Sequence, residues 1–339
     1  MGQKMPTIRE IAKKLQISPS TVSRALHNHH SIGLRTKMKV QELAKKLQYE
    51  PNQNAIFFKQ RRTFSVGVIL PNLSESFFSS AISGIEDFAI ANHYRVLFGQ
   101  SHDDAIREAQ ILETMKNFRV DGILVSISKS TMNYDHFKSL KKYNIPIVFF
   151  DRIPAMSKIN SVACDLEAGI KQAVCFLSQK KHEHIALING PEMLPASRER
   201  LKGFKNALKE HQIKLHSDLI VSTDLSQESN YRAMQQLLSL KSRPTAVIAF
   251  NDYVALDAIQ YAKKMKLKIN KDIVFVSFAN LPLSAYIEST PLASIEQFPY
   301  EQGKAAMEIL VKLIEEGKAH SLESRTSRII MQPKLEVRD

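Results

Sequence analysis

Residues 18–24 (SPSTVSR) combine short hydroxyl side chains with one arginine at the spacing of a helix face. Ser18 can cap the free amide groups of a first helical turn, and a proline such as Pro19 suits the first helical position. The polar face of such a helix would carry Ser20, Thr21, Ser23 and Arg24. Hydroxyls can hydrogen-bond phosphate oxygens, and a guanidinium can bind the edge of guanine in the DNA major groove. The stretch therefore predicts either a DNA-reading helix or an ordinary amphipathic surface helix.

Another short helix is needed to position this one, and the residues before Ser18 supply it. Thr7 and Glu10 form a capping box, which marks the start of a helix. Apolar residues follow at helical spacing, namely Ile8, Ile11, Ala12 and Leu15. The short break at 16–17 predicts a helix-turn-helix, whose second helix enters the major groove. A third helix is predicted over 36–48, before the residues YEPN.

The positive charge of the chain is concentrated in this N-terminal segment. The 339 residues carry a formal net charge of +13, and residues 1–62 alone account for +10 of it. The rest of the chain is nearly neutral. A basic head on a nearly neutral body predicts an anionic polymer or surface as the partner of the head alone.

Composition and motifs exclude several classes of protein. No stretch approaches the roughly 18 consecutive apolar residues of a membrane helix, and the first residues lack the apolar core of a signal peptide. The two cysteines, Cys164 and Cys175, cannot build a disulfide framework, which favours a reducing compartment. No nucleophile elbow, phosphate loop or dinucleotide fingerprint is present, and the run His182-Glu183-His184 lacks the further ligands of a metal site. We expect no enzyme, no cofactor, no metal and no membrane contact, and we expect a cytoplasmic protein that joins the nucleoid when bound to DNA.

The head resembles the LacI/GalR family of bacterial transcription repressors. The resemblance lies in the runs TIREIAKKLQISPSTVSRAL and AKKLQYEPN. It implies that Pro19, Ser20 and Arg24 read bases while Thr21 and Ser23 lie near phosphates. Pro19 offers no side-chain hydrogen bond, so Ser20 and Arg24 should carry most of the direct readout. His27 stands where the family usually has asparagine, in a basic loop that contacts phosphate or solvent.

The segment that follows the head, 52–63, resembles the hinge of that family. In the family a leucine of the hinge wedges into the minor groove, and the equivalent position here is Phe58. An apolar wedge unstacks a base step and bends the duplex. The alternative is that Phe58 and its neighbours Ile56 and Phe57 pack beneath the following domain.

From Phe64 onward, short apolar runs alternate with amphipathic segments of helix length such as 81–91 and 105–117. This alternation predicts an α/β architecture with parallel sheets. The predicted strands are Val66–Leu70, Arg95–Phe98, Gly122–Ile127, Pro146–Phe150, Ile185–Ile188, Leu219–Val221, Ala246–Phe250 and Ile273–Phe278. The number of units predicts two lobes with a ligand cleft between them, at the carboxyl ends of the strands.

The resemblance to the family continues over nearly the whole length and implies a periplasmic-binding-protein-like effector domain. It is visible in the runs FFDR, KHEHIALING, SRERLKGF, RPTAVIAFND and PLASIEQ. We therefore expect a helix-turn-helix head at 1–51, a hinge at 52–63 and an effector and dimerisation domain at 64–339. One lobe is expected to hold 64–152 and 292–315, and the other 161–279 and 326–339.

Carried over by position, six residues are expected to line the effector cleft. They are Phe77, Phe78, Asp151, Arg200, Asn251 and Asp252. Asparagine and aspartate supply donors and acceptors for vicinal hydroxyls, and Arg200 matches an arginine that donates to the ligand in many members. Two alternatives stay open, since Asp252 can instead cap the following helix and Phe78 can belong to the core.

The sequence departs from the family at positions that bear on the ligand. Ala279 stands where the family usually has a ligand-contacting aspartate, and Leu194 and Ala196 replace the arginine and threonine of purine-responsive members. A sugar or sugar derivative is therefore favoured over a purine.

Together these features predict a homodimeric regulator, a repressor in the first place, that binds near-palindromic double-stranded operator DNA under the control of a small carbohydrate. The alternatives are a sugar-binding protein with a basic N-terminal extension, or a nucleoside- or purine-responsive regulator.

Overall fold

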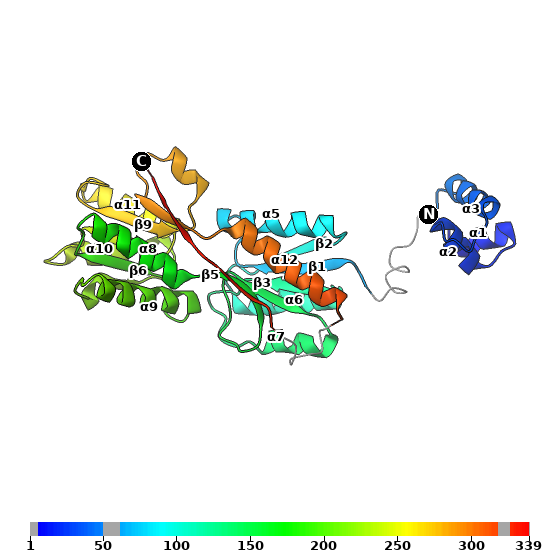
Figure 1. Ribbon diagram of the computed structural model, residues 1–339, viewed down its shortest axis with the longest axis horizontal. Helices are drawn as coiled ribbons and strands as arrows, with labels where there is room; N and C mark the ends of the chain where they lie inside the picture. The colour runs from blue at the N-terminus through cyan, green and yellow to red at the C-terminus, as the bar shows by residue number, and fades with distance from the viewer. Residues whose placement is uncertain (1–5, 50–61, 318–325, 339) are drawn as a thin grey trace. The chain divides into compact units, whose positions relative to one another are not determined.

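A computed structural model describes residues 6–49, 62–317 and 326–338. The chain divides into two compact units, Met1–Thr63 and Phe64–Asp339, which we call the head and the effector unit (Figure 1). We describe each unit by itself.

The described residues 6–49 of the head form three helices, α1 (Ile8–Leu15), α2 (Pro19–Leu26) and α3 (Leu34–Lys46). The Thr7 hydroxyl accepts a hydrogen bond from the Glu10 amide, and the Ser18 hydroxyl accepts one from Thr21, so the helix starts expected from the sequence are confirmed. Helix α3 begins two residues earlier than predicted. Its N-cap is Gly33, which has no side chain and therefore makes no side-chain capping hydrogen bond.

The core of the head is small. Its buried residues are Ile11, Ala12, Val22, Ala25, Val40 and Ala44. Because the three helices share this one core, the orientation of α2 depends on a few aliphatic contacts with α1 and α3.

The effector unit has two lobes, each built on a six-stranded sheet. The first sheet has the order β11-β5-β4-β3-β1-β2, and its neighbouring strands all pair in parallel. Its strands are β1 (Ser65–Leu70), β2 (Arg95–Gln100), β3 (Gly122–Val125), β4 (Ile147–Phe150), β5 (Asn160–Cys164) and β11 (Arg328–Met331). Its helices are α5 (Ser76–Ala91), α6 (Ala105–Asn117), α7 (Asp135–Ser139) and α12 (Pro299–Glu315), and the 3-10 turn Leu140–Tyr143 follows α7.

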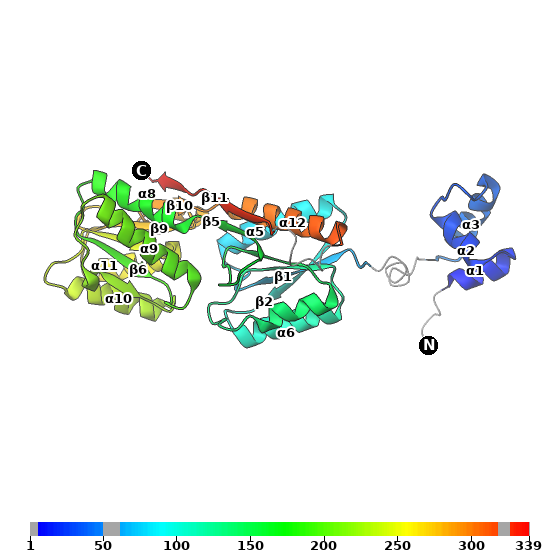
Figure 2. The ribbon, with the colours of Figure 1, turned by 60° about the horizontal axis from the view of Figure 1, so that its bottom comes forward.

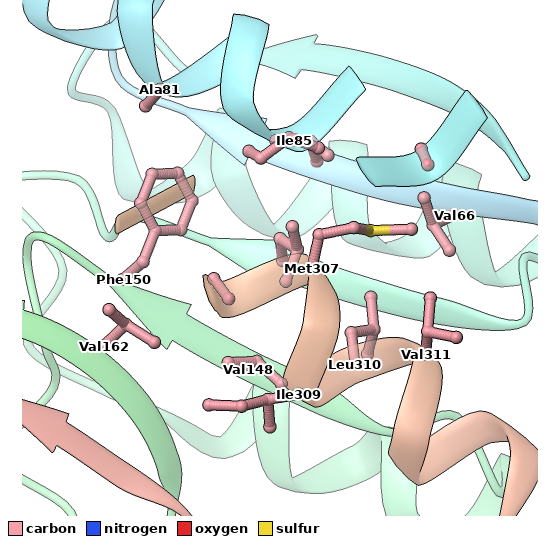
Figure 3. Close-up of a cluster of buried hydrophobic side chains, with 14 of the residues drawn as sticks. Val66, Ala81, Ile85, Val148, Phe150, Val162, Met307, Ile309, Leu310 and Val311 are labelled. Atoms are coloured by element: carbon pink, nitrogen blue, oxygen red, sulfur yellow. The ribbon is translucent and has the colours of Figure 1, made fainter. Parts of the chain in front are cut away.

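Alternating side chains of the first sheet face two different helix pairs. Val66, Val148 and Phe150 pack against α5 and α12 (Figure 3), whereas Ile69 and Phe149 pack against α6 and α7. Helices α5 and α12 approach so closely that a Cβ on Gly84 would lie 2.0 Å from the Tyr300 carbonyl oxygen. Glycine is needed there because any side chain would force the two helices apart.

The second sheet has the order β12-β10-β9-β8-β6-β7, in which only the β10–β12 pair is antiparallel. Its strands are β6 (Ile185–Asn189), β7 (Ile220–Ser222), β8 (Ala246–Ala249), β9 (Val274–Phe278), β10 (Ala293–Glu296) and β12 (Lys334–Val337). Helices α8 (Leu166–Gln179) and α9 (Pro195–Glu210) cover one face, and α10 (Gln227–Ser239) and α11 (Asp252–Lys264) cover the other. Two 3-10 turns, Ser217–Leu219 and Pro282–Tyr286, complete this lobe.

The lobe that the sequence analysis predicted is wrong for three strands. Strand β5 pairs with β4, as in Phe149 with Ser161, so residues 160–164 belong to the first lobe and not to the second. Strand β11 pairs with β5 and also belongs to the first lobe, while β10 pairs with β9 in the second. The chain therefore crosses between the lobes just after β5, just after β10, and between β11 and β12 (Figure 2). The lobe assignment of these strands was wrong because the residues of a strand do not indicate which neighbouring strand it pairs with.

In the part of the chain that the structure describes, no helix is long and apolar enough to cross a membrane.

Candidate functional site

Helix α2 presents its polar side chains on the surface of the head. Pro19, Ser20 and Arg24 are exposed, and Thr21 and Ser23 are partly exposed. The opposite side of the helix is anchored, since Val22 and Ala25 are fully buried. The structure thus gathers the predicted base-reading and phosphate-contacting residues on one accessible face.

The Ser18 hydroxyl organises the front of this face. It lies 2.7 Å from the Ser20 hydroxyl and 2.8 Å from the Thr21 hydroxyl. The start of α2 therefore offers a compact cluster of hydroxyl groups, and hydroxyl groups can hydrogen-bond phosphate oxygens.

The loop after α2 is fixed by α3. Asn28 has a left-handed backbone with φ of 54°; its carbonyl oxygen accepts a hydrogen bond from Lys37 Nζ and its Oδ1 accepts one from Gln41 Nε2, both at 3.0 Å. His27, which ends α2, is exposed. Phe58 and the remainder of the predicted hinge up to residue 61 lie outside the described residues, so the minor-groove wedge stays a prediction.

A cavity of about 50 Å³ lies between the two lobes of the effector unit. It forms where parallel strands of both sheets end, because its lining includes Asp151 after β4, Cys164 at the end of β5, Asn251 after β8 and Ala279 after β9. Such carboxyl-end positions are where open α/β sheets bind ligands.

Five of the six residues predicted for the effector cleft line this cavity. They are Phe77, Phe78, Asp151, Arg200 and Asn251. Phe78 is also part of the hydrophobic core of the first lobe, with an exposed fraction of 2%, so the two interpretations of this residue are compatible.

The prediction that Asp252 lines the cavity is not supported by its position. Its carboxylate is fully buried and receives hydrogen bonds from Ser277, from the Ser294 hydroxyl at 2.8 Å and from the Leu281 amide at 2.6 Å. Arg338 Nη2 lies 3.2 Å away and completes the shell. Asp252 therefore ties α11 to β9, β10 and the C-terminal end of the chain, and has no free oxygen for a ligand. Asn251, and not Asp252, caps α11.

Arg200 enters the cavity from the first turns of α9. Its guanidinium carbon lies 4.2 Å from the ring centre of Phe250 and 4.6 Å from that of Phe278, so the cation is held between two aromatic rings. Its exposed fraction is 4%, and burial lowers the pKa of its guanidinium to about 10, although Asp151 acts in the opposite direction. A buried charge in such an environment is ready to bind a polar or anionic group.

Asp151 faces the cavity from the first lobe. Its Oδ2 accepts a hydrogen bond from the Ser126 hydroxyl at 3.0 Å, and burial raises the pKa of its carboxyl above the usual value despite the neighbouring Arg152. The backbone at Asp151 is left-handed, with φ of 57°, and Ala279 across the cavity has φ of 89°. Left-handed conformations at non-glycine residues store strain and often occur at ligand sites.

The sequence prediction missed several residues that line the cavity. They include Glu75, Arg152, Cys164, Tyr253 and Gln297. Arg152 follows Asp151 directly in the run FFDR, and that adjacency at the end of a strand is the signal that could have identified it. Glu75 stands beside the start of α5, where burial raises the pKa of its carboxyl. Gln297 gives no signal, because only the chain crossing after β10 brings it to the cavity.

A chain of contacts leads from the cavity to a bridge between the lobes. The side chain of Arg152 forms an ion pair with Asp103, whose same Oδ1 accepts a hydrogen bond from the Lys129 amide at 2.9 Å. The ammonium of Lys129 then donates to the Asp224 carbonyl oxygen of the second lobe at 2.8 Å. These contacts join the Arg152 side of the cavity to the second lobe.

A larger concavity of about 890 Å³ adjoins the cavity and shares Asp151, Cys164, Leu166 and Ala196 with it. It includes solvated charged groups, such as the Lys171–Glu210 ion pair, whose side chains are 59% and 50% exposed. The smaller cavity is the candidate ligand site, because polar groups of both lobes, among them the buried Arg200, converge on it. Among the described residues, no group of three or more His, Cys, Asp or Glu side chains could hold a metal ion.

Comparisons with known proteins agree with both units. Residues 7–52 match the family model of bacterial regulatory proteins of the lacI family, and residues 66–319 match the periplasmic binding protein domain. The chain is 31% identical over 307 residues to catabolite control protein A of Priestia megaterium, covering 90% of this chain and 92% of that protein. It is 31% identical over 305 residues to the transcriptional repressor CytR of Escherichia coli K12, covering 90% and 89%.

The same fold occurs in the crystal structure of the lac repressor dimer bound to operator and an anti-inducer. That structure has a TM-score of 0.82 and 23% identity, with coverage of 99% of this chain and 98% of that chain. The relatives are transcriptional regulators and not enzymes. The chain therefore belongs to the lacI family of bacterial regulatory proteins and is a DNA-binding transcriptional repressor.

Proposed function

We propose that this repressor binds a near-palindromic operator as a homodimer and that a small sugar or sugar derivative in the inter-lobe cavity controls the binding. The exposed polar face of α2 supports this proposal most strongly. Ser20 and Arg24 discriminate bases, while Thr21, Ser23 and His27 contact the phosphate backbone. The repressor acts in the cytoplasm, on the DNA of the nucleoid.

The homodimer is needed because a single short helix reads too few base pairs for specificity in a genome. The effector unit exposes large apolar side chains that suit a subunit interface. In the second lobe Tyr286 is 86% exposed and Leu283 is 50% exposed, and in the first lobe Ile90 is 70% exposed. Isolated apolar side chains are common on protein surfaces, and these three lie on the 3-10 turn Pro282–Tyr286 and near the end of α5.

The effector acts through its different affinities for two arrangements of the lobes. Asp151 and Arg200 approach the cavity from opposite lobes, so a ligand that binds both favours one arrangement. The hydrogen bond between Lys129 and Asp224 then forms or breaks as the lobes change their arrangement. This rearrangement changes the separation of the two heads in the dimer.

Selection from randomised duplexes with the full-length protein tests the operator proposal. We expect enrichment of an inverted repeat with half-sites about one helical turn apart or a multiple of it. In Arg24→Ala, the preference at one base position of each half-site should relax by about 1–3 kcal/mol, because a bidentate base contact is lost.

Lys45→Ala is the matched control, since it removes one positive charge from exposed α3 and should weaken binding to all sequences alike. Failure to enrich any inverted repeat would disprove sequence-specific binding as a dimer. An unchanged base preference in Arg24→Ala would disprove only the role of Arg24.

A further inference from the structure

The two walls of the cavity differ in chemical character. The second lobe contributes Leu166, Ala196, Arg200, Phe250, Asn251, Tyr253, Ala279 and Leu281. Among the described residues, no carboxylate of this lobe lines the cavity. The carboxylates that do, Glu75 and Asp151, both come from the first lobe. The cavity thus has an acidic side and an opposite side without acids.

Asn251 acts as a donor on the second-lobe wall. Its Oδ1 accepts a hydrogen bond from the Val254 amide at 2.9 Å as the cap of α11. A side-chain amide has one acceptor oxygen and an NH₂ group with two donors. Because the oxygen is held by the helix, the NH₂ group remains for a ligand.

Arg200 is the second donor, and its charge has no partner of opposite sign in direct contact. Its Nη1 donates to the Ala196 carbonyl oxygen at 3.3 Å, and its buried Nε has no hydrogen-bond partner. No carboxylate of the described residues forms an ion pair with it, whereas Arg152 is paired with Asp103 and Arg338 with Asp252. An unpaired charge with an exposed fraction of only 4% is unfavourable unless something compensates it.

The first turn of α9 adds to the positive character of this wall. Leu194 occupies the N-cap of this 16-residue helix and provides no side-chain hydrogen bond. Pro195 has no amide hydrogen and the Ser197 amide donates to the Leu194 carbonyl oxygen at 3.0 Å, which leaves the Ala196 amide of the first turn for a ligand. Ala196 in this turn lines the cavity together with Arg200. An uncapped helix N-terminus and a buried guanidinium at the same place favour a negative charge.

We propose that the effector carries a carboxylate or phosphate group, which binds between the Arg200 guanidinium and the first turn of α9 with its remaining hydroxyl groups directed to Asp151. The proposal rests on the proposed function, in which this cavity is the effector site. A neutral sugar would also hydrogen-bond Arg200, but it would bring no opposite charge to a guanidinium that the rings of Phe250 and Phe278 and the more distant Asp151 and Glu199 stabilise without direct pairing. An acidic sugar derivative matches both walls at once, since hydroxyl donors suit the acidic side and the anion suits the other.

Matched pairs of ligands test the proposal on the full-length protein. Thermal shift and calorimetric titration would compare galactose with galacturonate, glucose with gluconate and with glucose 6-phosphate, ribose with ribose 5-phosphate, and the nucleosides adenosine and cytidine. At least one acid should bind about 10- to 100-fold more tightly than its neutral parent, the range expected for a hydrogen bond to a charged group. The carboxylate and phosphate arms separate the two kinds of anion.

Arg200→Gln should abolish the preference for the acid over its parent. The variant keeps a hydrogen-bonding side chain and should fold, because it removes a buried charge. Arg198→Gln is the matched control, since Arg198 is exposed on the same helix and its loss should leave the preference unchanged. Inorganic phosphate, compared with chloride at equal ionic strength, should stabilise the wild type more than Arg200→Gln.

A neutral sugar or nucleoside that binds as tightly as every acid would overturn the proposal, as would a panel in which no acid binds. A preference for acids that survives in Arg200→Gln would overturn the assignment of the site. Operator selection by the same preparations distinguishes these failures from a failure of the proposed function, because it requires no effector.

Discussion

The DNA-facing surface of α2 and the inter-lobe cavity are both polar sites, but they place their charged groups in opposite environments. Arg24 stands exposed on a helix whose other side is anchored in a core of six buried residues. Arg200 is buried between two aromatic rings, and Asp151 and Glu75 have carboxyls whose pKa burial raises. The first site attracts a polyanion through solvated groups, whereas the second has already desolvated its charges before any ligand binds.

Because of this contrast, substitutions at the two sites should have different effects on recognition and on stability. In the head, a substitution on the surface changes recognition and one in the small core removes the fold. In the effector unit, the large cores resist single changes, but buried polar networks are sensitive to them. The largest expected effect therefore comes from the core of the head.

Val22→Asp should unfold the head and leave the effector unit folded. Val22 is fully buried, and an unpaired carboxylate there costs several kcal/mol, which is comparable to the whole stability of so small a unit. Affinity for the operator should fall by about 1,000-fold or more, to the level of non-specific binding. Calorimetry of the full chain should still show the transition of the effector unit.

Met38→Asp is the matched control, because it introduces the same charge on α3 at a side chain that is 61% exposed. It should reduce affinity far less. If Val22→Asp also abolished the transition of the effector unit, the two units would not be independent and the comparison would fail.

How much the sequence could predict follows the same contrast. The head was predictable because its signals are local, with Thr7, Ser18 and Pro19 marking helix starts within a few residues of the groups that they position. The alternation of strands and helices in the effector unit was equally local. The pairing of β5, β10 and β11 was not, since it depends on register with distant strands, and the lobe assignment went wrong at those strands.

The cavity was predictable only in part for a related reason. Residues from seven separate segments of the chain meet there, and resemblance alone pointed to Arg200 and Asn251. The neighbours Asn251 and Asp252 show the limit, because the backbone turns between β8 and α11 and sends one side chain to the cavity and the other into the sheet. No periodicity in the sequence states which of the two goes where.

Asp252→Ala should destabilise the effector unit by about 3–5 kcal/mol. The substitution leaves Arg338, Ser277 and Ser294 without their shared acceptor inside the protein, and breaking a buried ion pair has this typical cost. Denaturant unfolding followed in the effector unit measures the change. Operator binding at low temperature should persist, because the head does not contain this network.

Asp218→Ala is the control, since Asp218 is exposed. The double variant Asp252→Ala, Arg338→Met should lose less stability than the two single variants together, because each removes the same interaction. A loss below about 1 kcal/mol in Asp252→Ala would show that the network contributes little and that buried polar groups do not distinguish the effector unit from the head.

Asp151→Asn should have the smallest effect and should depend on pH. Burial raises the pKa of the Asp151 carboxyl in the folded protein, so the folded state binds this proton more tightly than the unfolded state does. The stability that Asp151 contributes is therefore fully present below the carboxyl pKa of the unfolded chain and is lost as the pH rises through the raised pKa. Asparagine cannot ionise, so the variant should be more stable than the wild type at pH 8 and should lose that advantage near pH 4, as measured by thermal unfolding of the effector unit.

Glu288→Gln is the control, because it neutralises an exposed carboxylate of the same unit. It should leave the difference in stability between the two pH values unchanged. If Asp151→Asn were equally destabilising at both pH values, its hydrogen bond with Ser126 would outweigh its desolvation, and the cavity would resemble the solvated surface of α2 more closely than its burial indicates.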